Sequence, residues 1–377
     1  MRRTIFGSSR SFKQYAASFD KVLLLFVLIA LAVGMLAVNS ATLTKDMHVR
    51  CLVVQSLAIC IGLTAMFILS RIDYDMLSKL SKWLVLFSFV ILLLTAFLAE
   101  NRNGNRNWLY IAGVSIQPSE LTKPIFILTM SHQLATMGKD MNKFKNILKL
   151  CLHFAMYFIP IILQGDIGTA IVYFAMFSVM LFIAGLRYTY IVIGVSALVA
   201  ALPIGWMLLK DYHRRRIIYG FRPELDPLGT GYQPLASRMA IGSGQLTGMG
   251  YGQGIQSQNS LLPEIQTDFI YAIIGEEGGF IASVAVILIL LTITILIVKD
   301  GLRAKNQKGY LICIGVATMI MVQTVINIGM CIGVSPVIGI TLPFISYGGS
   351  SVLSLLLSLG LVYSVCVKPD TSLKFSA

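Results

Sequence analysis

Residues 270–298 read IYAIIGEEGGFIASVAVILILLTITILIV, and this stretch decides the class of fold. Roughly 20 helical residues cross a hydrocarbon core of about 30 Å, so an apolar run of this length predicts a membrane-spanning helix. The whole chain has the same character, because 56% of its 377 residues are hydrophobic and 12% are charged. Soluble domains carry about a quarter of their residues as charged side chains. The composition therefore excludes a soluble enzyme, a nucleic-acid-binding module and a disulfide-stapled secreted domain.

Similar apolar runs recur along the chain. They cover residues 22–39, 52–70, 83–98, 119–134, 150–163, 167–184, 190–209, 310–331 and 342–367. With the run at 270–298, they predict an all-α polytopic membrane protein of about ten transmembrane helices in a single membrane domain, 1–377. A β-barrel is excluded, since its strands would alternate polar and apolar residues.

The positive charge is unevenly distributed along the chain. The net charge is +13, and the lysines and arginines gather at both ends and in alternate connections. By the positive-inside rule, these segments lie in the cytoplasm. We therefore expect a cytoplasmic N-terminus at 1–21, a cytoplasmic C-terminus at 368–377 and an extracytoplasmic position for the longest connection, 210–269.

The connection at 210–269 combines glycines and charges with apolar residues, whereas disordered segments lack apolar residues. We expect a folded loop that carries the active-site region; a glycine-rich spacer is the alternative. Glycine recurs at every second position from Gly248 to Gly254, which fits neither a dinucleotide motif nor a phosphate loop. No histidine has a helical i, i+4 partner, so a zinc hydrolase is not expected.

Several motifs together resemble one family. They are GNRNW at 104–108, QPSELTK at 117–123, QGDIGT at 164–169, GYQ at 231–233 with AIGSG at 240–244, LPEIQTDF at 262–269 with Glu276 and Glu277, and LPFISYGGSS at 342–351. In this order they resemble the RodA/FtsW/SpoVE proteins of bacterial cell-wall synthesis, the SEDS family. The resemblance covers about residues 20–367, nearly the whole chain.

The resemblance implies a ten-helix glycosyltransferase of the bacterial cytoplasmic membrane. Such proteins polymerise lipid II into glycan strands on the outer face, release undecaprenyl diphosphate, and work with a class B penicillin-binding protein that cross-links the strands. Elongation, division or sporulation complexes are the expected setting, and nucleic acid is not an expected partner. The family pattern places the functional carboxylate in Thr-Asp-Phe, which matches Asp268.

The reaction sets its own requirements for residues. A lipid-diphosphate donor already has a good leaving group, so one general base for the acceptor hydroxyl suffices, with positive charge or a divalent cation near the diphosphate. Asp268 lies where the long connection re-enters the membrane, and an apolar neighbourhood would raise its pKa and improve it as a base. The alternative role for Asp268 is a helix cap, as for Thr267.

Other polar residues are candidates for substrate binding. Arginine matches the geometry of phosphate, so Arg214, Arg215 and Arg238 are assigned to the diphosphate. For the run of three arginines at 214–216, contact with anionic lipid headgroups is the alternative. Glu120 and Lys123 form either a structural ion pair or part of a cavity wall. Trp108 stacks on a sugar or anchors at the interface. The remaining candidates are Arg106, Gln117, Asp166, Gln233, Ser237, Thr267 and Glu276, of which Glu276 is expected to support the site or to pack the helix.

Three residues depart from the family pattern. Asn107 stands where arginine is frequent, Gln245 where a second glycine is frequent, and Gln266 where histidine is frequent before Thr-Asp. Because Gln266 cannot relay a proton at neutral pH, a mechanism that needs histidine there is in doubt. Two rivals to the enzyme remain: a lipid II flippase, which needs no outward-facing base, and a scaffold that recruits a transpeptidase and tolerates replacement of Asp268.

Overall fold

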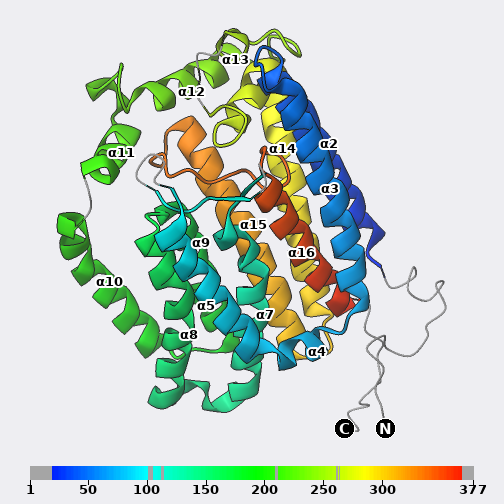
Figure 1. The fold of residues 1–377 in the computed structure, drawn as a ribbon, viewed down its shortest axis with the longest axis vertical. Helices are drawn as coiled ribbons and strands as arrows, with labels where there is room; N and C mark the ends of the chain where they lie inside the picture. The colour runs from blue at the N-terminus through cyan, green and yellow to red at the C-terminus, as the bar shows by residue number, and fades with distance from the viewer. Residues whose placement is uncertain are drawn as a thin grey trace.

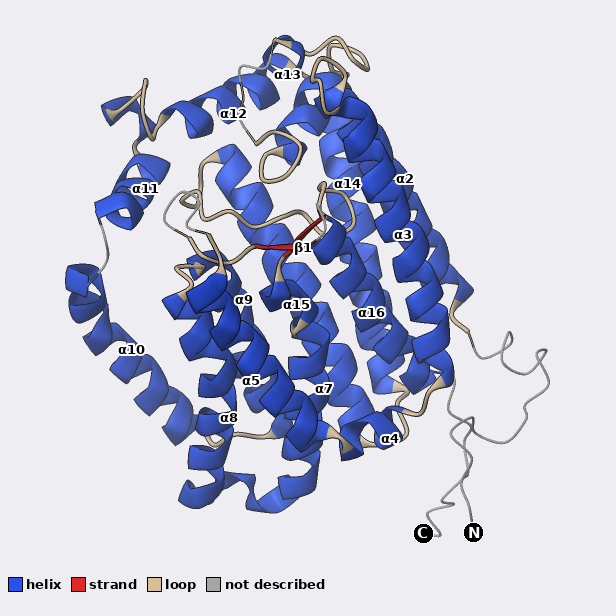
Figure 2. Ribbon diagram, in the orientation of Figure 1, coloured by secondary structure: helices blue, strands red, loops and turns tan. Residues whose placement is uncertain are grey.

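The computed structural model describes residues 19–100, 105–111, 114–208, 211–259, 262 and 264–366, and this part of the chain is almost entirely helical (Figures 1 and 2). The helices are α2 (Lys21–Thr42), α3 (His48–Arg71), α4 (Tyr74–Lys79), α5 (Ser81–Leu98), α6 (Pro118–Leu121), α7 (Lys123–Met137), α8 (Phe144–Leu163), α9 (Ile167–Ala184), α10 (Tyr188–Leu208), α11 (Asp211–Phe221), α12 (Tyr232–Ser243), α13 (Ile255–Gln258), α14 (Ile270–Leu302), α15 (Gln307–Ile332) and α16 (Gly349–Cys366), with two 3₁₀ turns, η1 (Gly138–Asn142) and η2 (Pro223–Leu225). One antiparallel hairpin, β1 (Leu109–Ile111) and β2 (Val114–Ile116), pairs Leu109 with Ile116.

The predicted helical membrane architecture is confirmed. Each predicted apolar run overlaps a helix, and eight described helices are long and apolar enough to cross a bilayer. The other two runs correspond to α7, which has 15 residues, and α10, which has 21. The last run differs from the prediction at its start, because the chain from 342 becomes helical only at Gly349. Most of the two predicted cytoplasmic ends lies outside the described residues.

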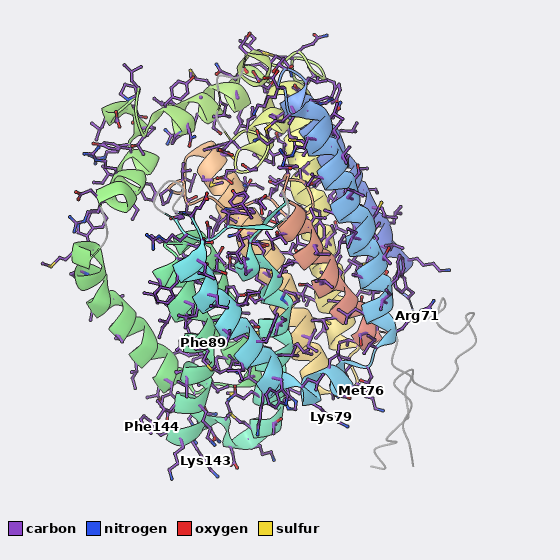
Figure 3. The ribbon with its side chains drawn as sticks, viewed as in Figure 1. Arg71, Met76, Lys79, Phe89, Lys143 and Phe144 are labelled. Carbon is purple, nitrogen blue, oxygen red and sulfur yellow. The ribbon has the colours of Figure 1, made fainter. Side chains whose placement is uncertain are left out.

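Helices α15 and α16 are the most buried spans, whereas α3 and α5 turn most of their surface outward. The outward side chains of those two helices are large and apolar, which suits contact with lipid. Helix α10 stands away from the bundle, and the chain continues through α11 to α12 and α13, which lie across one end of the bundle (Figure 1). Gly220 of α11 packs against Pro336, since a Cβ there would lie 2.6 Å from the Pro336 Cα. The start of α2 and the end of α16 lie toward the opposite end, where Figure 3 labels Lys79 and Lys143.

Helix α14 is broken within its first third. Gly279 has φ 67° and ψ −163°, outside the helical range, so the predicted continuous span is two helical pieces. The connection before α14 satisfies the backbone at the break. Gln245 and Leu246 carbonyls accept hydrogen bonds from Phe280 N (2.8 Å) and Ile281 N (3.2 Å). Unpaired backbone groups are costly in a membrane, so this pairing stabilises the break.

On the other side of the break, the connection donates hydrogen bonds and α14 accepts them. Met249 N and Gly250 N donate to the carbonyls of Glu276 and Glu277, each at 3.0 Å. The two pieces of α14 thus exchange hydrogen bonds with the segment 245–250, which includes the start of the alternating glycines at 248–254. Gln245 adopts φ 48° there, a conformation that glycine adopts more readily than glutamine.

Two buried carboxylates fasten the rest of the connection. Glu276 Oε1 and Oε2 accept from Gln256 N (2.7 Å) and Ser257 N (3.1 Å), the first turn of α13. Glu277 Oε1 accepts from Ser257 Oγ (3.3 Å) of the same turn and from Ser40 Oγ of α2 (2.5 Å). A carboxylate at a helix N-terminus is favourable because the first backbone N–H groups have no partner within the helix. Glu276 is therefore a packing residue here, fully buried with both oxygens occupied.

Glycine is required at position 248. Gly248 has φ +80°, and a Cβ there would lie 2.0 Å from the Glu277 carbonyl oxygen. We expect Gly248→Ala to lower stability by roughly 1–2 kcal/mol for the strained backbone and by about 1–3 kcal/mol more for the overlap. Gly250→Ala is the matched control, because Gly250 has φ +102° but its nearest neighbour would be a Gln253 side-chain atom at 3.4 Å. Thermal unfolding in detergent measures both, and equal losses would contradict the packing described.

Candidate functional site

Asp268 lies two residues before α14, on a backbone that other elements hold at three consecutive carbonyls. Tyr347 N donates to Gln266 O (2.9 Å), Ser346 Oγ to Thr267 O (2.6 Å), and Asn327 Nδ2 to Asp268 O (2.9 Å). Asn327 is a fully buried residue of α15. The half-buried carboxylate of Asp268 is thus carried on a segment, 264–269, that is fixed before the helix begins.

The partners of this segment are themselves held in place. Gln55, fully buried in α3, donates to Ser346 O (3.2 Å) and accepts from Gly348 N (3.1 Å). Ser346 Oγ also accepts from Leu342 N (2.8 Å). The motif at 342–351 therefore works as a bracket between α3 and the Asp268 segment.

Lys45 supplies a positive charge at the same segment. Its Nζ donates to Gln266 Oε1 (2.5 Å), from the connection between α2 and α3. Partial burial lowers the pKa of Lys45 below its ordinary value, and the nearby carboxylate of Glu264 opposes that effect. Gln266 thus acts here as a hydrogen-bond acceptor for an ammonium group.

The irregular stretch after α15 contacts both Asp268 and the start of α9. A Cβ on Gly339 would lie 3.4 Å from Asp268 Oδ2, so the backbone passes directly beside that carboxylate. A Cβ on Gly168 of α9 would lie 2.7 Å from the Ile338 carbonyl oxygen. Neighbouring residues of the stretch thus meet Asp268 and the start of α9.

Asp166 organises a second group of polar residues. Its Oδ2 accepts from Asn107 Nδ2 (2.9 Å) and Gln117 Nε2 (2.8 Å), and its Oδ1 accepts from Thr169 N (3.0 Å) at the start of α9. Gln117 N donates to Ser350 Oγ of α16 (3.1 Å). The structure therefore brings Gln117 and Asp166 together. It adds Asn107, one of the three residues that depart from the family pattern.

Glu120 and Lys123 form a buried ion pair at the junction of α6 and α7. The Lys123 side chain is 1% exposed, and the Glu120 side chain is 9% exposed. Ser354 Oγ of α16 donates to the Glu120 carbonyl oxygen (2.6 Å). Removing one partner of a buried pair leaves an uncompensated charge, so we expect replacement of either Glu120 or Lys123 alone to be destabilising.

The predicted diphosphate arginines have protein partners. Arg214 Nε and Nη2 donate to the carbonyls of Trp206 (3.0 Å) and Met207 (2.6 Å) at the end of α10. Arg238 pairs with Glu224 (3.4 Å) and donates to Gly333 O (3.2 Å). Arg215 is exposed on α11. Arg214 and Arg238 thus serve the packing of the connection between α10 and α14 in this conformation.

The remaining candidates lie before β1, in α12 and in the turn before α14. Arg106 is exposed, and Trp108 is half-buried just before β1. Gln233 is half-buried at the start of α12, and the buried Ser237 Oγ donates to the Cys331 carbonyl oxygen (2.9 Å). Thr267 Oγ1 donates to Glu264 O (3.1 Å), so it is tied to its own turn.

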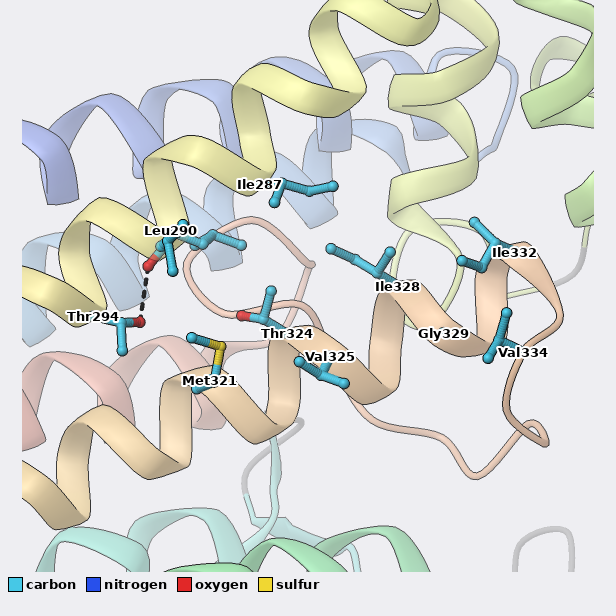
Figure 4. Close-up of a pocket in the computed structure, with 11 residues that line it drawn as sticks. Ile287, Leu290, Thr294, Met321, Thr324, Val325, Ile328, Gly329, Ile332 and Val334 are labelled. Atoms are coloured by element: carbon cyan, nitrogen blue, oxygen red, sulfur yellow. Dashed lines mark hydrogen bonds between the residues drawn. The ribbon is translucent and has the colours of Figure 1, made fainter.

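In the described ranges, no three His, Cys, Asp or Glu side chains lie close enough together to hold a metal ion. A groove of about 340 Å³ between α14 and α15 is lined mainly by apolar residues, among them Ile287, Met321 and Val334 (Figure 4). The Thr294 and Thr324 hydroxyls bond within their own helices. The groove suits hydrocarbon and offers no catalytic group.

Sequence reasoning missed four residues that hold Asp268: Lys45, Gln55, Asn327 and Ser346. Gln55 and Asn327 carried a usable signal, since an uncharged polar side chain inside a membrane span needs a partner. Lys45 had no such signal, because its contact joins connections 221 residues apart in the chain.

The chain was compared with known families, sequences and structures. The family described as "Cell cycle protein" (FtsW/RodA/SpoVE) matches residues 20–370. Stage V sporulation protein E of Bacillus subtilis is 36% identical, with 92% of this chain and 96% of that protein covered. Peptidoglycan glycosyltransferase MrdB of Escherichia coli is 34% identical, with 81% and 83% covered.

Solved structures agree with the sequence comparison. A chain from a peptidoglycan synthase complex, described for the coordination of polymerization and crosslinking, superposes with a TM-score of 0.79 at 28% identity, covering 92% of this chain and 97% of that one. The rod shape determining protein RodA of Thermus thermophilus superposes with a TM-score of 0.70 at 26% identity, covering 92% and 96%. The protein is therefore an integral membrane protein that belongs to the FtsW/RodA/SpoVE family.

Proposed function

We propose that the chain is a peptidoglycan glycosyltransferase that polymerises lipid II on the outer face of the cytoplasmic membrane, with Asp268 as the general base. The observation that carries the proposal is the fixed backbone of the Asp268 segment, at the end of the bundle that bears α12 and α13. The glycosyltransferase name of the MrdB relative supports the reaction class.

The proposed step needs few groups. Asp268 takes the proton of the acceptor 4-hydroxyl as that oxygen bonds to the donor's anomeric carbon. The bond from that carbon to the diphosphate breaks, and its electron pair leaves with undecaprenyl diphosphate. A positioned base contributes about 10²- to 10⁴-fold to such a step.

The surroundings of the base divide the remaining work. We propose that two groups of residues shape the wall of the substrate cavity near Asp268. One is the Asp166 cluster, which is Asp166 with its donors Asn107, Gln117 and Thr169, and the other is the Glu120–Lys123 pair. We propose that the opposite end, with both termini, lies in the cytoplasm, which the basic connections near Lys79 and Lys143 support. A class B penicillin-binding protein is the proposed partner, supported by the similarity to a chain of a peptidoglycan synthase complex.

Replacing the base tests the proposal directly. We expect Asp268→Ala and Asp268→Asn to reduce glycan polymer from labelled lipid II by about 10²-fold or more. Asp46→Asn is the control, since Asp46 is an exposed carboxylate on the α2–α3 connection. Polymer is measured on gels with purified protein, with and without the partner. If Asp268→Ala polymerises as well as the wild type, a flippase or a scaffold replaces the enzyme as the better account.

The hydrogen bonds to Asp166 predict that the effects of substitutions in this cluster on stability are not additive. Asp166→Ala removes the acceptor of Asn107, Gln117 and Thr169 together, and we expect a loss of roughly 1–3 kcal/mol in unfolding free energy because buried donors lose their partner. The same change in an Asn107→Leu, Gln117→Leu background should cost less, because those two donors are already gone. Thermal unfolding of the four proteins measures this; strictly additive losses would show that the three side chains do not act as a unit.

A further inference from the structure

The cation that contacts the Asp268 segment comes from the connection between α2 and α3, a source that the sequence analysis did not assign to the site. Lys45 N donates to Thr42 O (2.9 Å), and Lys45 O accepts from His48 N (3.0 Å). Thr42 Oγ1 and His48 Nδ1 lie 2.9 Å apart across the same turn. The Lys45 side chain therefore extends from a tightly bonded turn.

Lys45 retains donors for a further partner. An ammonium group has three N–H donors, and the described residues give Lys45 one side-chain hydrogen bond, to Gln266 Oε1. It forms no ion pair with any carboxylate in the part of the chain that the structure describes. Gln266 is neutral, so it orients the ammonium without cancelling its charge.

A second bond reaches the residue that Lys45 contacts. Tyr347 N donates to Gln266 O, and the Gln266 side chain accepts from Lys45. The Lys45 ammonium therefore meets the Asp268 segment at the residue that the 342–351 motif also holds.

We propose that Lys45 binds the diphosphate of the lipid-linked donor next to Asp268. The identity of this ligand rests on the proposed function. A carboxylate base alone would repel a diphosphate, and a fixed ammonium offsets that repulsion. The same ammonium stabilises the charge that develops on the departing diphosphate. The arginines first assigned to this task, Arg214 and Arg238, are bonded elsewhere.

Direct binding tests this assignment without requiring turnover. The full chain in nanodiscs of neutral lipid is titrated with undecaprenyl diphosphate and, as a probe of the lipid tail alone, with undecaprenol. We expect Lys45→Met to weaken diphosphate binding about tenfold or more, the usual worth of a charge-assisted hydrogen bond, and to leave undecaprenol binding unchanged. Lys45→Arg should restore most of the affinity. Lys143→Met is the control, since Lys143 is an exposed lysine paired with Asp140.

The pH dependence gives a readout that a purely structural role would not move. Binding to protonated Lys45 is complete below its pKa and is lost as the pH rises through it. Because burial lowers the pKa of Lys45, the wild type should lose affinity at lower pH than Lys45→Arg. Glu264 and Cys51 are the other titratable neighbours, so Glu264→Gln should move the wild-type loss to still lower pH.

The outcomes separate this inference from the proposed function. Equal diphosphate affinity in wild type and Lys45→Met would overturn it, as would parallel losses for diphosphate and undecaprenol. Asp268→Ala should still bind the diphosphate, because its defect lies in proton transfer. A wild type that binds through Lys45 but makes no polymer would refute the enzyme and leave the binding site standing.

Discussion

The hydrogen bonds across the break in α14 are the constraint on which the rest of the structure depends. A helix interrupted inside a membrane exposes N–H and C=O groups that neither lipid nor water satisfies. Here the segment 245–250 pairs with both pieces of α14, and Glu276 and Glu277 fasten the neighbouring residues. The connection between α10 and α14 is thereby folded against the bundle, and the chain must turn sharply at 264–269 to enter α14. Asp268 lies in that turn.

The site follows from this turn. Three consecutive carbonyls at 266–268 accept hydrogen bonds from the 342–351 motif and from α15, so the Asp268 carboxylate has a fixed backbone. Gln55 secures the motif from α3, and Lys45 contributes charge from the connection before it. Elements from both ends of the sequence thus converge on one carboxylate, which is what a positioned base with an adjacent anion site requires.

Much of this was predictable, for clear physical reasons. The bilayer demands long apolar helices, so the membrane spans, eight of them in the described part of the chain, could be identified from the apolar runs. The position of Asp268 just before α14 followed from the family motif. The break at Gly279 could not be predicted from the sequence, because the run at 270–298 is apolar enough to form one continuous membrane-spanning helix. The alternating glycines of 248–254 were noticed, but their purpose depends on a partner distant in sequence. Arg214 and Arg238 looked like phosphate ligands by residue type, yet their partners are backbone carbonyls and Glu224.

Hydrogen–deuterium exchange of the protein in nanodiscs tests the central claim most directly. The amides of Met249, Gly250, Phe280 and Ile281 all donate across the break. If the segment 245–250 is folded onto α14 as described, these four amides exchange slowly. Their exchange rates are then comparable to those of amides in the interior of α15. Exchange of Met249 and Gly250 at the rate of an open loop would show that the connection does not hold the break, and the account of how Asp268 is positioned would fail.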